Sequence, residues 1–182
     1  RMRIISFSAD GIKNAAENGF FDWLNEQDAD FICVQDLQCS EYDLQDNIFF
    51  PADYNAYFFD DVDGKANGVA IYCRKMPKAI MTGLGFTDFD MEGRYIQADY
   101  ENLSVACLLA PHAEPKDAFR EINSDRDEFS WWPDGKRGEN GWRTDFQIIS
   151  QGLKYAVDYG AIYKIKEFST HAPVIMDYDI EL

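Results

Sequence analysis

Short apolar runs, separated by polar or glycine-containing turns, dominate the pattern of this chain. Residues 31–34 are wholly apolar and too few for a helix, so they predict a strand that is buried on both faces. Other runs of similar length and composition predict further strands. These runs cover residues 3–7, 54–59, 68–73, 78–82, 94–100, 104–109, 161–165 and 174–180.

Helical patterns are fewer and shorter. Residues 12–27 carry apolar positions at helical spacing, and Gly19 is placed to interrupt that helix. Ser40 is a candidate N-cap for a short helix over residues 40–46, and residues 151–157 predict another short helix. Many closely spaced strands with few long helices predict an α+β fold, a two-sheet β-sandwich flanked by helices.

Composition is consistent with one folded domain over residues 1–182. The chain is 46% hydrophobic, which is enough to bury a core at this length. Its 17 basic and 33 acidic residues give a net charge of −16, which repels polyanions. We therefore expect weak or no binding to free nucleic acid.

The four cysteines, at positions 33, 39, 73 and 107, have neither zinc-site nor disulfide-framework spacing. Most lie inside apolar runs, so buried reduced thiols and a cytoplasmic location are expected. No run approaches the roughly 18 apolar residues that a membrane-spanning helix needs, and no signal-peptide pattern is seen. A membrane partner is therefore not expected.

Candidate chemistry concentrates in residues 129–173. Asp145 precedes the apolar run 146–149 and His171 precedes the final strand, so each is expected at a strand edge where their side chains can meet. A carboxylate beside an imidazole fixes the ring tautomer and raises its basicity. The pair is predicted to be hydrogen-bonded, in either a catalytic or a purely structural role.

A set of phrases stands in order along the chain: residues 4–12 (IISFSADGI), 34–36 (VQD), 68–70 (GVA), 141–146 (GWRTDF) and 169–173 (STHAP). Together they resemble the motifs of the exonuclease III and apurinic endonuclease family. The resemblance implies an endonuclease/exonuclease/phosphatase fold, in which enzymes use a Mg²⁺-binding carboxylate cluster and an imidazole to cleave phosphodiesters.

Further phrases are similar to a regulatory branch of that family, the catabolite repression control proteins. They are residues 83–86 (GLGF), 93–99 (GRYIQAD), 129–134 (FSWWPD), 171–173 (HAP) and 177–179 (DYD). This resemblance implies a catalytically inactive translational co-repressor that joins Hfq on A-rich mRNA leader sequences. The chain itself offers candidate binding residues for such a partner, the adjacent tryptophans Trp131 and Trp132 and the basic residues Lys136, Arg137 and Arg143.

Departures from the enzymes' motifs favour the regulator. Ser8 replaces an asparagine, Asp36 a longer glutamate and Thr170 an aspartate, while Leu109 replaces a tyrosine. We therefore expect no enzyme activity, no metal and no cofactor. The family positions that remain are Ser8, Asp10, Asp36, Asp145, Thr170 and His171.

The alternative is a Mg²⁺-dependent phosphodiesterase of the exonuclease III or apurinic endonuclease type, acting in DNA repair. The resemblance also implies a central strand and helices that this chain lacks between Ala113 and Asp117. If those residues exist in the molecule, they could restore missing catalytic groups.

Overall fold

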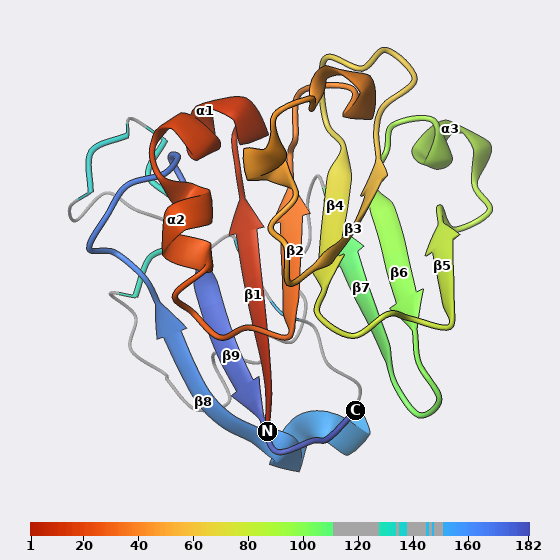
Figure 1. The fold of residues 1–182 in the computed structure, drawn as a ribbon, viewed down its shortest axis with the longest axis vertical. Coiled ribbons are helices and arrows are strands. Elements are labelled where there is room, and N and C mark those ends of the chain that lie inside the picture. Colours follow the sequence, from red (N-terminus) through yellow and green to blue (C-terminus); the bar gives the residue numbers. More distant parts are fainter. Residues whose placement is uncertain (111–127, 134, 138–144, 146, 148–150) are drawn as a thin grey trace.

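The computed structural model describes residues 1–110, 128–133, 135–137, 145, 147 and 151–182 (Figure 1). Its strands are β1 (Met2–Ser8), β2 (Phe31–Gln35), β3 (Asn55–Phe59), β4 (Val69–Cys73), β5 (Ala79–Thr82), β6 (Tyr95–Asp99), β7 (Ser104–Leu108), β8 (Val157–Ile162) and β9 (Val174–Tyr178). Its helices are α1 (Ile12–Glu17), α2 (Phe20–Leu24) and α3 (Thr87–Asp90), with 3₁₀ turns η1 (Glu41–Asp43), η2 (Asn47–Phe49) and η3 (Gln151–Ala156).

These strands form two sheets, which confirms the predicted α+β sandwich. The described part of the larger sheet has six strands in the order β3-β4-β2-β1-β9-β8, and the smaller has three in the order β5-β6-β7. Only β1 and β2 run parallel among the described pairs, with Ile4 opposite Phe31 and Ser8 opposite Gln35. Their carboxyl ends therefore meet at one edge of the larger sheet (Figure 1).

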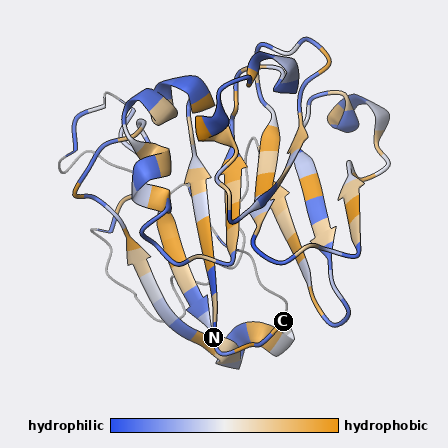
Figure 2. Ribbon diagram, in the orientation of Figure 1, coloured by the Kyte–Doolittle hydropathy of each residue, from blue (hydrophilic) through white to orange (hydrophobic). Residues whose placement is uncertain are grey.

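Hydrophobic residues fill both faces of the larger sheet. One buried cluster joins the outer face of β1 and β2 to α1 and α2, and includes Phe7, Phe20 and Phe168. A second cluster lies on the opposite face and joins β2 and β4 to the smaller sheet. Figure 2 shows the hydrophobic residues gathered in the strands, while the connecting loops are mostly hydrophilic. The two-faced burial explains why residues 31–34 carry no polar alternation.

The helices differ from the predicted ones in length. Gly19, at a φ of 90°, divides the predicted helix 12–27 into α1 and α2, because a left-handed residue cannot continue an α-helix. The helix predicted over residues 40–46 is the single turn η1, capped by Ser40 as expected. Helix α3 was not predicted, since it is a single turn in a glycine-rich segment.

Strand β8 corrects the predicted strand 161–165, because it begins at Val157 and ends at Ile162. This strand lies at the edge of the described sheet, and some of its side chains are exposed. These exposed positions and a register shift near Val157 obscure the alternation of apolar and polar residues from which a strand is predicted. The apolar run 146–149 and the proposed gap between Ala113 and Asp117 lie largely or wholly outside the described residues. No helix in the described ranges is long and apolar enough to span a membrane.

Candidate active site

The carboxyl ends of β1 and β2 are joined in a way that turns acidic side chains toward each other. The Gly11 amide donates to the Asp36 carbonyl at 3.0 Å, so the two loops that leave these strands run side by side. Asp10, Asp36 and Gln38 have φ values of 47°, 60° and 56°, a region that non-glycine residues rarely adopt. Strained backbone of this kind concentrates at functional sites because surrounding structure must hold it there.

Asp10 and Asp36 form a carboxylate pair bridged by an amide. Nε2 of Gln38 donates to Oδ1 of Asp10 at 3.0 Å and to Oδ2 of Asp36 at 2.9 Å. Burial raises the pKa of Asp36 and the Asp10 charge raises it further, although the Gln38 hydrogen bond acts in the opposite direction. A neutral amide holds the two carboxylates together without cancelling their charge.

The segment Ser169–Thr170–His171 lies across the end of β1. The Thr170 hydroxyl donates to Oδ2 of Asp10 at 3.3 Å, so it touches the carboxylate pair directly. The Ser169 hydroxyl donates to the main-chain carbonyl of Ser8 at 2.8 Å. Ser8 is buried and thus helps to anchor this segment through its main chain.

Asp145 and His171 are hydrogen-bonded, which confirms the predicted contact. Nδ1 of His171 lies 2.8 Å from Oδ2 of Asp145. The Asp145 carboxylate is nearly buried, at 6% side-chain exposure, while the imidazole keeps 18%. When Nδ1 donates to the carboxylate, the lone pair of the neutral ring is on Nε2, where it can accept a proton. Thr170, the neighbour of His171 in the chain, bonds to Asp10, so the dyad and the carboxylate pair belong to one site.

The two adjacent tryptophans separate, as expected for neighbours in an extended segment. Trp131 pairs with His171 in an isolated antiparallel bridge, and its ring stacks on the imidazole with centroids 5.6 Å apart and planes 18° apart. Trp132 is 3% exposed and belongs to the core between the sheets, so it is not available to contact a partner. Trp131 therefore belongs to the candidate active site.

The basic residues predicted to bind a partner also separate. Arg137 packs over the Trp132 ring at 4.7 Å and donates to the main-chain carbonyls of Ser169 and His171. Lys136 is exposed. Arg143 lies outside the described residues.

Gln38 is the site residue that sequence analysis missed. It stands two positions after Asp36, and no motif marks it. Only the left-handed conformation of Asp36 and Gln38 turns the amide back onto both carboxylates. Residue spacing could not have revealed this contact.

The donors at this edge suit a hard cation. Mg²⁺ takes oxygen ligands and is often bound through one or two carboxylates, with waters and substrate phosphate completing its shell. Asp10 and Asp36 supply two such carboxylates, both bonded to Nε2 of Gln38. Among the described side chains, no cationic group is bonded directly to either carboxylate. The described residues contain no group of three His, Cys, Asp or Glu side chains that could hold a metal alone. The donor set therefore fits a cation shared with substrate.

Comparison with known proteins identifies relatives of this chain. Residues 6–138 match the sequence profile of the "Endonuclease/Exonuclease/phosphatase family". An "Exodeoxyribonuclease" of Bacillus subtilis (strain 168) is 24% identical, with 95% of this chain and 98% of the relative covered. That alignment runs over 251 residues, more than the 182 of this chain, so part of the relative has no counterpart here. The "DNA repair nuclease APEX1" of Danio rerio is 28% identical over 62% of this chain, which spans 37% of that relative.

Solved structures support the fold. An "AP Endonuclease from Archaeoglobus fulgidus" superposes with a TM-score of 0.85 at 16% identity, covering 99% of this chain and 100% of that one. A "3' phosphatase NExo" from Neisseria, bound to a product DNA hairpin, gives 0.80 at 15% identity, covering 99% and 100%.

These relatives correct one expectation from the sequence. The prediction of a protein without enzyme activity is wrong, because the sequence relatives are named as nucleases and the similar structures as nucleases or phosphatases. The substitutions at Ser8 and Thr170 therefore do not exclude an enzyme. Thr170 still contacts Asp10 through its hydroxyl, and the contact between Ser8 and the neighbouring segment uses the Ser8 main-chain carbonyl, which does not depend on the side chain.

Proposed function

This chain belongs to the endonuclease/exonuclease/phosphatase family, and we propose that it hydrolyses phosphate esters in nucleic acid. The observation that carries the proposal is the Asp145–His171 dyad, whose histidine directly follows Thr170, the residue bonded to the Asp10 carboxylate. A general base next to a cation-binding carboxylate pair is the minimum equipment for metal-assisted attack of water on a phosphate.

His171 is the proposed general base. With Nδ1 bonded to Asp145, Nε2 of the neutral imidazole accepts a proton from the water that attacks phosphorus. Asp145 holds the ring in this tautomer and stabilises the imidazolium that forms. The new P–O bond forms as the ester P–O bond breaks, and the leaving oxygen takes a proton from solvent.

Asp10 and Asp36 would hold Mg²⁺. When bound, the cation would neutralise charge on the phosphate and polarise its P–O bonds. Gln38 keeps the two carboxylates within reach of each other, with its Nε2 no more than 3.0 Å from either. Thr170 restrains Asp10 on the other side.

Trp131 gives the site an apolar wall beside His171. The indole covers one side of the imidazole and is itself only partly buried. A sugar or an unstacked base adjoining the reacting phosphate could pack on such a ring, because stacking on aromatic side chains tolerates different bases. This arrangement favours a nucleic-acid end, nick or damaged position over an intact duplex.

The net charge of −16 agrees with catalysis only when a cation is present. A polyanionic substrate meets a repulsive field, which salt or Mg²⁺ screens. Weak binding to free nucleic acid therefore stays a prediction for metal-free protein. A turnover that needs only brief binding is compatible with weak affinity.

The translational co-repressor is the less supported function. The relatives reported above are named for hydrolysis of DNA or phosphate, which favours a hydrolase. Assembly with Hfq on A-rich mRNA stays a prediction. A gel-shift titration of labelled A-rich RNA, with this protein, Hfq or both, would test it through a supershift of the Hfq complex.

The hydrolase is tested with labelled duplexes that carry an abasic site, a 3′-phosphate at a nick, or an intact backbone. We expect Mg²⁺-dependent product from at least one of the first two, and loss of that product in His171→Ala. Lys78→Ala, which changes an exposed charge beside β5 in the smaller sheet, is the matched control. No product from any duplex with Mg²⁺ or Mn²⁺, or equal product from His171→Ala, would contradict the proposal.

A further inference from the structure

Arg137 is unusual among the charged residues of the site, because it is largely buried and incompletely bonded. Its side chain is 11% exposed. Nη1 is buried and has no hydrogen-bond partner in the structure as described. Burial also lowers the pKa of Arg137, with the Glu167 charge acting in the opposite direction. An unpaired buried donor of this kind reduces stability, so its presence calls for a structural or functional explanation.

The contacts that Arg137 does make converge on one short segment. Nη2 donates to the carbonyls of Ser169 and His171 at 3.4 and 3.3 Å, which are long hydrogen bonds. Nε lies 3.4 Å from the Glu167 carboxylate. Each contact is weak alone, but together they hold both ends of residues 167–171.

Trp132, whose ring lies under Arg137, also contacts this segment through its main chain. The guanidinium packs over Trp132 at 4.7 Å, and the main-chain amide of Trp132 donates to the Thr170 carbonyl at 3.1 Å. The carbonyls on both sides of Thr170 are therefore held by Arg137, and the Thr170 carbonyl itself is held by the Trp132 amide. A planar guanidinium can stack flat on the ring and donate in its own plane, whereas a lysine ammonium has no flat face to stack.

This segment carries side chains that contact three parts of the site. Ser169 bonds to the end of β1, Thr170 bonds to Asp10, and His171 bonds to Asp145. A shift of its backbone would move the imidazole relative to both carboxylate groups. The ring position therefore depends on whatever holds the main chain at His171.

We propose that Arg137 is a positioning residue, which fixes the main chain of residues 169–171 and thereby sets the orientation of the His171 imidazole toward Asp145. The inference rests on the proposed function for its catalytic consequence, but not for its structural one. Arg137 acts through His171 and has no direct part in the reaction.

The test uses Arg137→Gln and Arg137→Lys in the full chain, with Arg74→Gln as the matched control. Arg74 also lies over an aromatic ring, Tyr54 at 5.8 Å, and pairs with aspartates at the opposite end of the sheet. The readout is the imidazole ¹H–¹⁵N spectrum of His171, identified in a His112→Gln background because the chain has 2 histidines.

We expect wild type and Arg74→Gln to show a single His171 tautomer with a protected Nδ1 proton. Arg137→Gln should lose that proton signal and populate both tautomers, and Arg137→Lys should fall between them. In hydrolysis assays Arg137→Gln should lower kcat by about 10- to 100-fold, with KM unchanged, since a misplaced base impairs only the chemical step.

A wild-type His171 spectrum and wild-type kcat in Arg137→Gln would overturn the proposal. If wild type hydrolyses nothing, the proposed function fails while the spectra still decide the role of Arg137. If Arg137→Gln does not fold, Arg137→Lys decides, and an unperturbed His171 signal there would count against the inference.

Discussion

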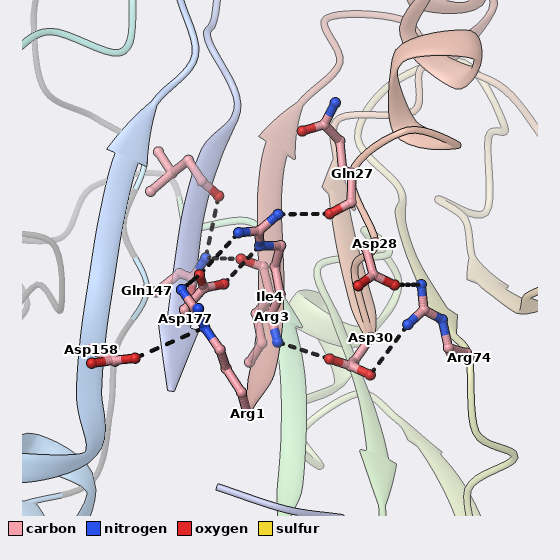
Figure 3. Close-up of polar contacts among 11 residues, drawn as sticks. Arg1, Arg3, Ile4, Gln27, Asp28, Asp30, Arg74, Gln147, Asp158 and Asp177 are labelled. Carbon is pink, nitrogen blue, oxygen red and sulfur yellow. Dashed lines mark hydrogen bonds and ion pairs between the residues drawn. The ribbon is translucent and has the colours of Figure 1, made fainter. Parts of the chain in front are cut away.

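Both ends of the larger sheet carry acidic side chains, but these side chains have different partners at each end. At the end that contains the chain start, Asp177 of β9 bonds to Arg1 and to Arg3, with Arg3 Nε 2.7 Å from Oδ1 (Figure 3). At the other end, Asp10 and Asp36 receive hydrogen bonds from an amide and a hydroxyl. The first end neutralises its carboxylate and the second leaves its pair charged.

The pKa shifts at the two ends have opposite signs. Burial alone would raise the pKa of Asp177, but the hydrogen bonds and charges of Arg3 and Arg1 outweigh it and lower the pKa. Burial and Asp10 raise the pKa of Asp36 despite its bond from Gln38. Asp177 therefore stabilises the fold in its charged form, whereas Asp36 keeps its charge at a cost to stability.

This difference separates a structural cluster from a functional one. The Arg3 guanidinium also donates to the Gln27 carbonyl at 2.7 Å, which ties β9 and β1 to the end of the helical segment (Figure 3). No comparable arginine bonds to Asp10 or Asp36 among the described residues. An acidic pair left in this state suits a ligand that brings its own positive charge.

The largest expected effect comes from Asp145→Asn. The amide would keep the size of the side chain but remove its charge and turn one acceptor oxygen into an NH2 donor, so the His171 tautomer would no longer be fixed. We expect the hydrolysis rate to fall by about 10²- to 10⁴-fold, the range of general acid–base catalysis. Single-turnover kinetics in Mg²⁺ measures this. Asp158→Asn changes an exposed residue at the other end of the larger sheet and should leave the rate unchanged. A similar loss of rate in both variants would contradict the contrast between the two ends of the sheet.

The same exchange at Asp177 should act on stability. Asp177→Asn removes the buried negative charge to which Arg1 and Arg3 are bonded, and we expect a loss of about 1–3 kcal/mol in the free energy of unfolding, because hydrogen bonds between charged groups are weakened. Urea denaturation gives this value. Asp158→Asn removes only a 3.9 Å ion pair between exposed groups and should cost under about 1 kcal/mol. Equal costs in the two variants would show that the buried cluster contributes nothing special.

Thr170→Asp adds a third carboxylate beside Asp10. Like charges at this distance should lower the melting temperature without metal, and Mg²⁺ should recover more of it than in wild type. Thr170→Ser keeps the hydroxyl and serves as the control. A variant that gains no extra response to Mg²⁺ would indicate that Thr170 does not face the cation position.

The smallest expected effect is in the pH dependence of stability. Asp177 has a lowered folded pKa, so its contribution is present above the unfolded value of about 3.9 and is lost as pH falls through the folded pKa. Asp36 has a raised folded pKa, so its contribution favours the fold at low pH and is lost as pH rises through that pKa. Asp36→Asn should therefore slightly stabilise the protein at neutral pH. The measurement is the urea midpoint of wild type, Asp36→Asn and Asp177→Asn from acid to neutral pH. If both variants changed the midpoint in the same direction at neutral pH, this expectation would be refuted.

Much of the fold could be predicted because local pattern and tertiary burial agree. The apolar run 31–34 became a central strand, and Gly19 broke the first helical segment as expected. Strand β8 could not be placed, because an edge strand with exposed side chains carries little pattern. The apolar runs used to predict strands reflect burial, so a strand that is not buried cannot be predicted from them.

The site was only partly predictable. The Asp145–His171 contact followed from strand edges and motif resemblance. The bridging role of Gln38 and the contact of Thr170 with Asp10 across 160 positions depend on loop conformations that spacing does not encode. Replacement of single family residues therefore suggested an inactive site, whereas the side chains that remain still converge.

The most direct test of this account is the melting temperature as a function of Mg²⁺ concentration, for wild type, Asp36→Asn and Asp177→Asn. A cation that binds only the folded protein raises its melting temperature. We predict a saturable rise for wild type, no rise for Asp36→Asn, and a rise of wild-type size from a lower starting point for Asp177→Asn. A wild type that does not respond, or an Asp36→Asn variant that responds equally, would contradict the claim that this end of the sheet is built for a cation.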